Sequence, residues 1–265
     1  MLQYPDINPI AIDFGFIKIS WYAISYILGI FSSWFLILKI VKIKKINVSN
    51  KIISELINNC MIGIILGGRL GYVFFYNPEY YFHNLIEIFK IWNGGMSFHG
   101  GFIGIVLAII YSSKTSKIPI TVFSDLISIV SPIGLFFGRI ANFINGELFG
   151  RVTNHPFGMI FPNGGKLPRH PSQLYEAFFE GLVLFLIMTF LMNTSKIFDI
   201  KGFLTATFVF SYGILRFFIE FYREPDDHIG LIYFDFSMGQ LLSLPMIIIG
   251  LYFMIVLYYK NKVYY

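Results

Sequence analysis

Seven long apolar stretches constrain the fold of this chain more than any other feature of its sequence. A helix needs about 20 apolar residues to cross the ~30 Å hydrocarbon core of a bilayer. Stretches of roughly that length lie at residues 20–38, 54–75, 97–113, 122–145, 174–192, 202–221 and 238–258. Of the 265 residues, 13% are charged and 56% are hydrophobic, whereas a soluble domain carries about 25% charged residues. The sequence therefore predicts an all-α integral membrane protein with seven transmembrane helices, in one polytopic domain over residues 1–265.

The basic residues between these stretches predict the orientation in the membrane. One set of connections includes the long segments 76–96, 146–173 and 222–237 and carries six basic residues. The other connections are short and carry eleven lysines, namely Lys39, Lys42, Lys44, Lys45, Lys51, Lys114, Lys117, Lys196, Lys201, Lys260 and Lys262. The positive-inside rule places the lysine-rich side in the cytoplasm. We therefore expect an outer N-terminus, a cytoplasmic C-terminus and a small outward-facing head formed by the long loops.

Charge and the N-terminal sequence exclude two other interpretations. The net charge of +5 is explained by membrane topology, so we expect no nucleic-acid partner. The segment "MLQYPDINPI" lacks a basic region followed by a short apolar one, so we expect no cleaved signal peptide.

Arginines inside apolar stretches need a reason, because an arginine near the bilayer centre is unfavourable by roughly 2.5–3.5 kcal/mol. In the sixth stretch, one helix face carries Tyr212, Arg216, Glu220 and Arg223. A structural Arg216–Glu220 pair would explain two of these residues. It leaves the tyrosine and the second arginine unexplained.

The fourth stretch ends in a second polar group. Arg139 and Asn142 share a helix face, Asn145-Gly146 is typical of a helix end, and Glu147 and Gly150 lie in the turn that follows. A structural alternative is that Arg139 pairs with a carboxylate and Asn142 bonds to a neighbouring helix. If only Glu220 and Glu147 lie near the two arginines, positive charge is left over, and a lipid phosphate is the natural anion to neutralise it.

The approach to the fifth stretch, "LPRHPSQLYE", supplies further carboxylates. Ser172 is expected to cap that helix. Glu176 and Glu180 share a face and are expected to pair with Arg69 or Arg151.

His99 stands among four glycines in "NGGMSFHGG", where the chain re-enters the membrane. A lone histidine is often a packed or capping residue, but histidine is also the side chain best suited to proton transfer near neutral pH. Both interpretations stay open from the residues alone.

The second stretch carries two further features. Its glycines at 63, 67 and 71 are spaced by four and predict close helix packing, whereas the role of Arg69 is undecided. The single cysteine, Cys60, is expected to be buried and inert. The histidines show no metal-ligand spacing, so we expect neither a metal nor a cofactor.

Six motifs in order resemble one known family. "GRIANFINGELFGR" is similar to the signature of the bacterial prolipoprotein diacylglyceryl transferases, and "GGRLGYVFFYN", "GGMSFHGG", "PRHPSQLYEA", "RFFIEFYREPD" and "SMGQLLSLPM" resemble its other motifs. The resemblance covers nearly the whole chain. It implies a seven-span inner-membrane enzyme that moves the diacylglyceryl group of phosphatidylglycerol onto the lipobox cysteine of a preprolipoprotein signal peptide. The product is a thioether, and sn-glycerol 1-phosphate leaves.

The resemblance also implies roles for individual residues. Those implied in catalysis are His99, Arg216, Glu147 and Tyr22. Those implied in substrate binding are Arg139, Asn142, Gly150, Tyr212 and Glu220. The base that takes the thiol proton is either His99 or a carboxylate network that includes Glu147, and these two options stay open.

The sequence fits two other functions less well. A transporter or lipid-binding channel predicts inverted repeats, and the two halves of the sequence show no such symmetry. An intramembrane hydrolase or protease needs a serine–base or metal motif, which the sequence lacks.

Overall fold

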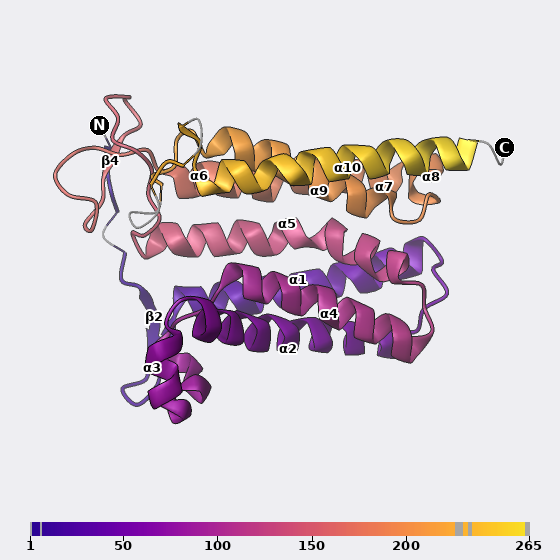
Figure 1. The fold of residues 1–265 in the computed structure, drawn as a ribbon, viewed down its shortest axis with the longest axis horizontal. Helices are drawn as coiled ribbons and strands as arrows, with labels where there is room; N and C mark the ends of the chain where they lie inside the picture. Colours follow the sequence, from indigo (N-terminus) through magenta and orange to yellow (C-terminus); the bar gives the residue numbers. More distant parts are fainter. Residues whose placement is uncertain (1, 6, 226–229, 233–234, 263–265) are drawn as a thin grey trace. The chain divides into compact units, whose positions relative to one another are not determined.

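The structure is a computed structural model that describes residues 2–5, 7–225, 230–232 and 235–262, and it is mostly helical (Figure 1). Helices occupy each of the seven apolar stretches. They are α1 (Trp21–Ile43), α2 (Asn50–Phe75), α4 (Phe98–Ser116), α5 (Ile120–Ile144), α6 (Ser172–Glu176) continued by the π-helix η3 (Ala177–Val183) and α7 (Leu184–Asn193), α9 (Phe203–Ile219) and α10 (Met238–Lys262). Five of these segments are long and apolar enough to cross a bilayer: α1, α2, α5, the α6–α7 segment and α10. The chain is thus a multi-pass, predominantly α-helical membrane protein.

The connections contain short elements of their own. Between α2 and α4 lie α3 (Pro78–His83) and two 3₁₀ turns, η1 (Leu85–Phe89) and η2 (Ile91–Asn93), and α8 (Ser195–Phe198) precedes α9. Strand β1 (Leu2–Gln3) pairs in parallel with β4 (Met159–Ile160), and β2 (Ile10–Asp13) pairs antiparallel with β3 (Lys18–Ser20). In the predicted outer segment 222–237, residues 226–229 and 233–234 lie outside the described residues.

The chain divides into two compact units, each of which is described by itself. Unit 1 comprises Met1–Ser33 and Asp125–Tyr265, and unit 2 comprises Trp34–Ser124. The prediction of a single polytopic domain stays a prediction.

In unit 2, α2 and α4 lie side by side through their glycines (Figure 1). A Cβ atom on Gly104 would overlap the carbonyl oxygen of Gly63, and one on Gly71 would lie 2.8 Å from Cα of Gly100. The contacts run in opposite directions along the two helices, so the pair is antiparallel. The glycine row predicted for packing is confirmed, and Cys60 is buried beside it as expected.

In unit 1, α9 and α10 form a second antiparallel pair (Figure 1). A Cβ on Gly213 would lie 3.1 Å from Cβ of Met246, and one on Gly250 would lie 2.6 Å from the backbone nitrogen of Phe210. Small residues therefore bring these helices into close contact at two levels.

A carboxylate on α5 caps the start of α9. The Asp125 oxygens accept hydrogen bonds from the backbone nitrogens of Gly202 (2.7 Å) and Thr205 (2.8 Å) and from the Thr205 hydroxyl (2.6 Å). The first N–H groups of a helix lack partners within the helix. Asp125 supplies partners for two N–H groups at the start of α9 and so ties α9 to α5.

Candidate active site

Arg139, near the end of α5, contacts two buried glutamates. Its Nε lies 2.7 Å from Oε2 of Glu176, and its Nη2 lies 3.6 Å from Oε2 of Glu180. Both glutamates are fully buried. The prediction that Glu176 and Glu180 pair with Arg69 or Arg151 is wrong, because these carboxylates face α5 and α9.

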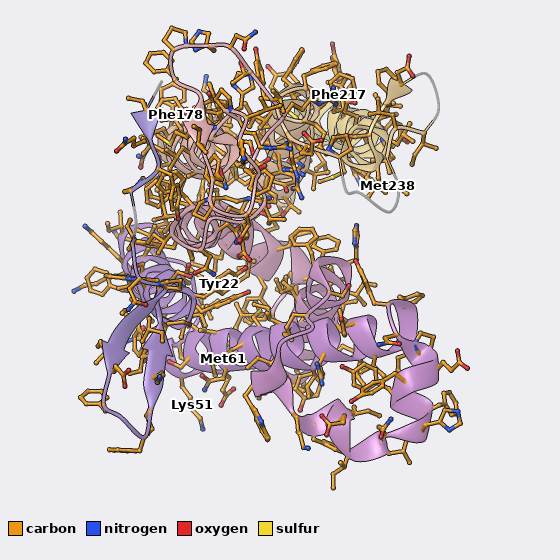
Figure 2. The ribbon with its side chains drawn as sticks, turned by 90° about the vertical axis from the view of Figure 1, so that its left-hand side faces the viewer. Tyr22, Lys51, Met61, Phe178, Phe217 and Met238 are labelled. Atoms are coloured by element: carbon orange, nitrogen blue, oxygen red, sulfur yellow. The ribbon has the colours of Figure 1, made fainter. Side chains whose placement is uncertain are left out.

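Arg216, near the end of α9, contacts three carboxylates. Its Nη1 lies 3.3 Å from an oxygen of Glu176 and 3.3 Å from an oxygen of Glu180. Its Nη2 lies 2.7 Å from Glu220, which confirms the Arg216–Glu220 pair expected one helical turn apart. Figure 2 labels Phe217, the residue that follows Arg216.

Arg223 completes the group from beyond the helix. Because α9 ends at Ile219, the prediction that Arg223 continues one stripe of this helix is wrong. Its Nη1 nevertheless lies 3.9 Å from Oε1 of Glu176. Burial lowers the pKa of Arg223, the nearby Arg216 lowers it further, and Glu176 acts in the opposite direction.

We call these six residues the arginine–glutamate cluster: Arg139, Arg216, Arg223, Glu176, Glu180 and Glu220. Three guanidinium groups face three carboxylates, so the formal net charge of the cluster is zero. The expectation of leftover positive charge on the arginines is therefore wrong. The expectation failed because Glu176 and Glu180 contact Arg139 and Arg216 and not Arg69 or Arg151.

The π-helix η3 carries Glu180 into the cluster. A π-helical segment within a transmembrane helix is rare and frequently occurs at a functional site. Beside it, a Cβ on Gly181 would lie 2.6 Å from Cβ of Phe136, so this glycine lets the helix approach α5 closely. The close approach brings Glu176 and Glu180 within reach of Arg139.

The cluster keeps unused donors. A guanidinium group has five N–H donors, and the contacts of Arg139 involve only Nε and Nη2. Among the described residues, no hydrogen bond or ion pair uses Nη1 of Arg139 or Nε of Arg216. Tyr212 is buried one turn before Arg216 and lies within electrostatic range of Glu180 and of both arginines. The cluster can still donate hydrogen bonds to a bound oxyanion.

A second group surrounds Glu147, just after the end of α5. The Asn142 amide donates to Oε1 of Glu147 (2.8 Å) and contacts the hydroxyl of Tyr22 (3.4 Å), which Figure 2 labels on α1. As predicted, Asn145-Gly146 follows the last helical residue, and Gly146 has a φ of +64°. The structure thus brings together Tyr22, Asn142 and Glu147.

The start of α6 holds this turn in place. Gln173 donates from Nε2 to the Glu147 carbonyl (2.6 Å), and the Ser172 hydroxyl donates to the Leu148 carbonyl (3.1 Å). The prediction that Ser172 caps its own helix is wrong, because Pro171 occupies the cap position and makes no side-chain cap bond. The sequence reasoning missed Gln173, which is fully buried. Its place in the shared motif "PRHPSQLYEA" was a usable signal.

Gly150 joins three chain segments where a side chain would not fit. Its N–H donates to the His170 carbonyl (2.8 Å), and it forms an antiparallel bridge with Arg223. A Cβ at this position would lie 2.7 Å from Cβ of His170 and would overlap the carbonyl oxygen of Tyr222. The glycine therefore fixes the segment that carries Arg223 beside the turn after Glu147.

His99 lies in unit 2, on the first turn of α4. Its side chain is exposed, and its ring centroid lies 5.7 Å from that of Phe98. Ser97 caps the helix by accepting a hydrogen bond from the Gly100 nitrogen (3.2 Å). Unit 1 thus contains eight of the nine predicted site residues, and unit 2 contains His99.

Comparison with known proteins decides the family. A model of the family described as "Prolipoprotein diacylglyceryl transferase" matches residues 9–256. The chain belongs to this family. Among its relatives, proteins of Rickettsia felis and Rickettsia conorii are 49% and 50% identical over 251 residues, which is 95% of this chain and 97% of theirs. A protein of Rickettsia bellii is 48% identical over 254 residues, or 96% of this chain and 97% of its own length.

All three relatives are named phosphatidylglycerol–prolipoprotein diacylglyceryl transferase. The resemblance drawn from the six motifs is therefore confirmed, and the chain is a transferase of lipoprotein biosynthesis. The roles of individual residues stay predictions.

Proposed function

We propose that this chain transfers the diacylglyceryl group of phosphatidylglycerol to the lipobox cysteine thiol of a preprolipoprotein, the first step of bacterial lipoprotein maturation. The observation that carries the proposal is the buried arginine–glutamate cluster, in a chain whose relatives bear the name of this activity over 95% of its length. The lipid phosphate binds the unused donors of Arg139 and Arg216. Guanidinium groups bind phosphate well because their planar fork matches its oxygens.

The reaction is a displacement at the glyceryl carbon that bears the phosphate. A base takes the proton from the cysteine thiol, whose ordinary pKa is about 8.5. The sulfur then forms a bond to that carbon, the carbon–oxygen bond breaks, and its electron pair stays on the phosphate oxygen. The leaving sn-glycerol 1-phosphate gains negative charge in this step. Arg139 and Arg216 stabilise that charge where it develops.

The base is His99 or the Glu147 carboxylate. Glu147 is half-buried, and Asn142 and Asn145 donate to a single oxygen of its carboxylate, which leaves the second oxygen to accept a proton. Tyr22 orients the Asn142 amide, whereas Gly150, Tyr212 and Glu220 shape the phosphate site. No metal or cofactor takes part in this scheme.

The direct test incubates purified protein with phosphatidylglycerol and a lipobox peptide. We expect a thioether-linked gain in peptide mass and release of glycerol phosphate. Arg139→Gln should abolish binding of the lipid head group, whereas Lys166→Gln, at an exposed lysine, should leave turnover unchanged. Movement of lipid across a vesicle membrane without any modified peptide would support the transporter instead.

Cys60 allows one further check. The proposed mechanism has no covalent enzyme intermediate, and Cys60 is buried. Cys60→Ser should therefore keep full transfer activity. A folded Cys60→Ser protein without activity would contradict this part of the scheme.

The same proposal includes seven membrane crossings in the bacterial inner membrane, with the N-terminus outside and the C-terminus in the cytoplasm. α2 and α10 are long enough to span, and α4 and α9 each run antiparallel along one of them. Because α4 packs along α2 and the 17-residue α9 packs along α10, we expect α4 and α9 to cross the bilayer as well. The long connections then form the outward-facing head.

Cysteine labelling tests this topology. In the Cys60→Ser background, a membrane-impermeant maleimide added to intact cells should label Lys166→Cys and leave Lys114→Cys unlabelled. The reverse pattern would overturn the orientation, and labelling of both would overturn the crossing assignment.

A further inference from the structure

Arg69 on α2 is a buried arginine whose partners are backbone carbonyl groups. It is 4% exposed. Its Nε donates to Ile88 (2.9 Å), its Nη1 donates to Gly94 (2.5 Å) and Gly95 (3.1 Å), and its Nη2 donates to Glu87 (2.5 Å). Among the described residues, no carboxylate pairs with it. We call this guanidinium and its four carbonyl partners the Arg69 clasp.

Aromatic contacts surround the clasp. The guanidinium carbon lies 5.1 Å from the ring centroid of Tyr81, within the range of a cation–π contact. Gly94 and Gly95 both have positive φ angles, +81° and +78°, so the chain turns sharply where it meets Nη1. The guanidinium group of Arg69 thus holds both ends of the segment 87–95.

The clasped segment leads directly to His99. The Ser97 nitrogen donates to the Gly68 carbonyl (2.8 Å), one residue before Arg69. The first turn of α4 then packs against α2 at Gly71 and Gly100. The exposed imidazole makes no hydrogen bond within the described part of the chain, so its position depends on the backbone that carries it.

We propose that Arg69 is a positioning residue for the transfer reaction. It holds the segment 87–95 against α2 and thereby sets the place of the His99 imidazole. The inference rests on the proposed function, in which His99 is one of two candidate bases. A purely structural contact is better served by an apolar side chain, because burying a charged group is unfavourable unless its donors are hydrogen-bonded.

The fork geometry explains why the residue is an arginine. Lysine offers three donors at one point, whereas the guanidinium group directs its donors along a plane to widely separated acceptors. A lysine at position 69 keeps the charge but does not bridge the carbonyls of residues 87–88 and 94–95 at once. Arg69→Lys therefore separates the effect of the clasp from the effect of charge.

The first arm of the test compares Arg69→Lys, Arg69→Gln and His99→Asn in the peptide transfer assay. Displacing a reacting group by about 1 Å lowers rates by up to about 100-fold. We expect both Arg69 variants to lower kcat by about 10- to 100-fold while KM for phosphatidylglycerol changes less than about threefold. A change confined to KM, or a normal kcat in Arg69→Lys, overturns the inference.

The second arm uses a matched pair of glycines, in case the Arg69 variants fail to fold. Gly95 and Gly165 have nearly the same φ, +78° and +82°, so alanine introduces similar backbone strain at both. A Cβ on Gly95 would lie 2.6 Å from the Tyr72 ring and 3.0 Å from Nη1 of Arg69, whereas one on Gly165 meets nothing within 4 Å. Gly95→Ala should lower kcat as Arg69→Lys does, and Gly165→Ala should not. Equal effects from both glycines overturn the inference.

His99→Asn distinguishes an error in the role proposed for His99 from an error in the role proposed for Arg69. If this variant transfers normally, the role proposed for His99 is wrong. If it is inactive while Arg69→Lys and Gly95→Ala are as active as the unchanged chain, the role of His99 stands and the positioning role of Arg69 is wrong.

Discussion

Replacing Glu180 by glutamine tests whether the arginine–glutamate cluster faces the lipid phosphate. The carboxylate lies 3.3 Å from Nη1 of Arg216 and 3.6 Å from Nη2 of Arg139. Glu180→Gln keeps the shape of the side chain but gives the cluster a net charge of +1. Removing one partner of a buried ion pair destabilises a protein by about 3–5 kcal/mol. Because Glu176 still contacts all three arginines, we expect the lower end of this range. The free energy of unfolding should fall by about 3 kcal/mol, which lowers Tm by roughly 6–12 °C.

Phosphatidylglycerol should restore much of this loss. A ligand at 100 times its Kd stabilises the folded state by about 2.7 kcal/mol. The phosphate supplies the negative charge that Glu180→Gln removes, so the lipid should bind the variant more tightly than the unchanged chain. Thermal unfolding in detergent, with phosphatidylglycerol or the zwitterionic phosphatidylcholine added, measures the difference. Only phosphatidylglycerol should raise Tm, and the rise should be larger for the variant.

The control is Glu55→Gln, at an exposed glutamate on α2 that lies outside the cluster. It should unfold at the temperature of the unchanged chain with either lipid. If phosphatidylglycerol stabilises Glu180→Gln no more than the unchanged chain, the cluster does not face the head group and the phosphate assignment is refuted.

Three further predictions concern stability. Asp125→Ala should lower the free energy of unfolding by about 2–4 kcal/mol, because it removes the carboxylate that accepts three hydrogen bonds at the start of α9; thermal unfolding measures it. Gly104→Ala should unfold at a clearly lower temperature because its Cβ would overlap a carbonyl, whereas Gly134→Ala, with nothing within 4 Å, should not. Partial burial, and secondarily His155, lower the pKa of His170 in the folded chain. As the pH falls, His170 therefore becomes protonated in the unfolded chain before it does in the folded chain. Tm should fall as the pH drops below about 6.5, and less so in His170→Gln.

Local features of the sequence predicted several parts of the structure. The glycines at 63, 67 and 71 predicted the close packing of α2 because spacing by four residues places them on one face of a helix. Asn145-Gly146 predicted the end of α5 because glycine readily adopts the positive φ that ends a helix. Both inferences need only residues that are neighbours along the chain or along one helix.

The pairing of charges could not be predicted in the same way. Glu176 and Glu180 meet Arg139 and Arg216 through contacts between different helices, which no spacing within one helix reveals. The π-helix around Glu180 changes the helical period, so extrapolation from an α-helix is unreliable there. Arg223 was placed on a helix face by its spacing, although α9 ends at Ile219 and the residue reaches Glu176 from the following turn.

The expectation of unpaired arginines also failed for a reason that concerns the reaction itself. An enzyme releases its substrate in every turnover, and during insertion it has no substrate at all. Arginines that relied on the lipid phosphate for neutralisation would be buried, unpaired charges for part of every cycle, which is strongly unfavourable. Carboxylates within the chain remove that penalty and hold the guanidinium groups in fixed positions. The donors left on Arg139 and Arg216 then meet the phosphate from guanidinium groups that are already largely buried and fixed in position, so more of the interaction is available to stabilise the charge that develops on the leaving group.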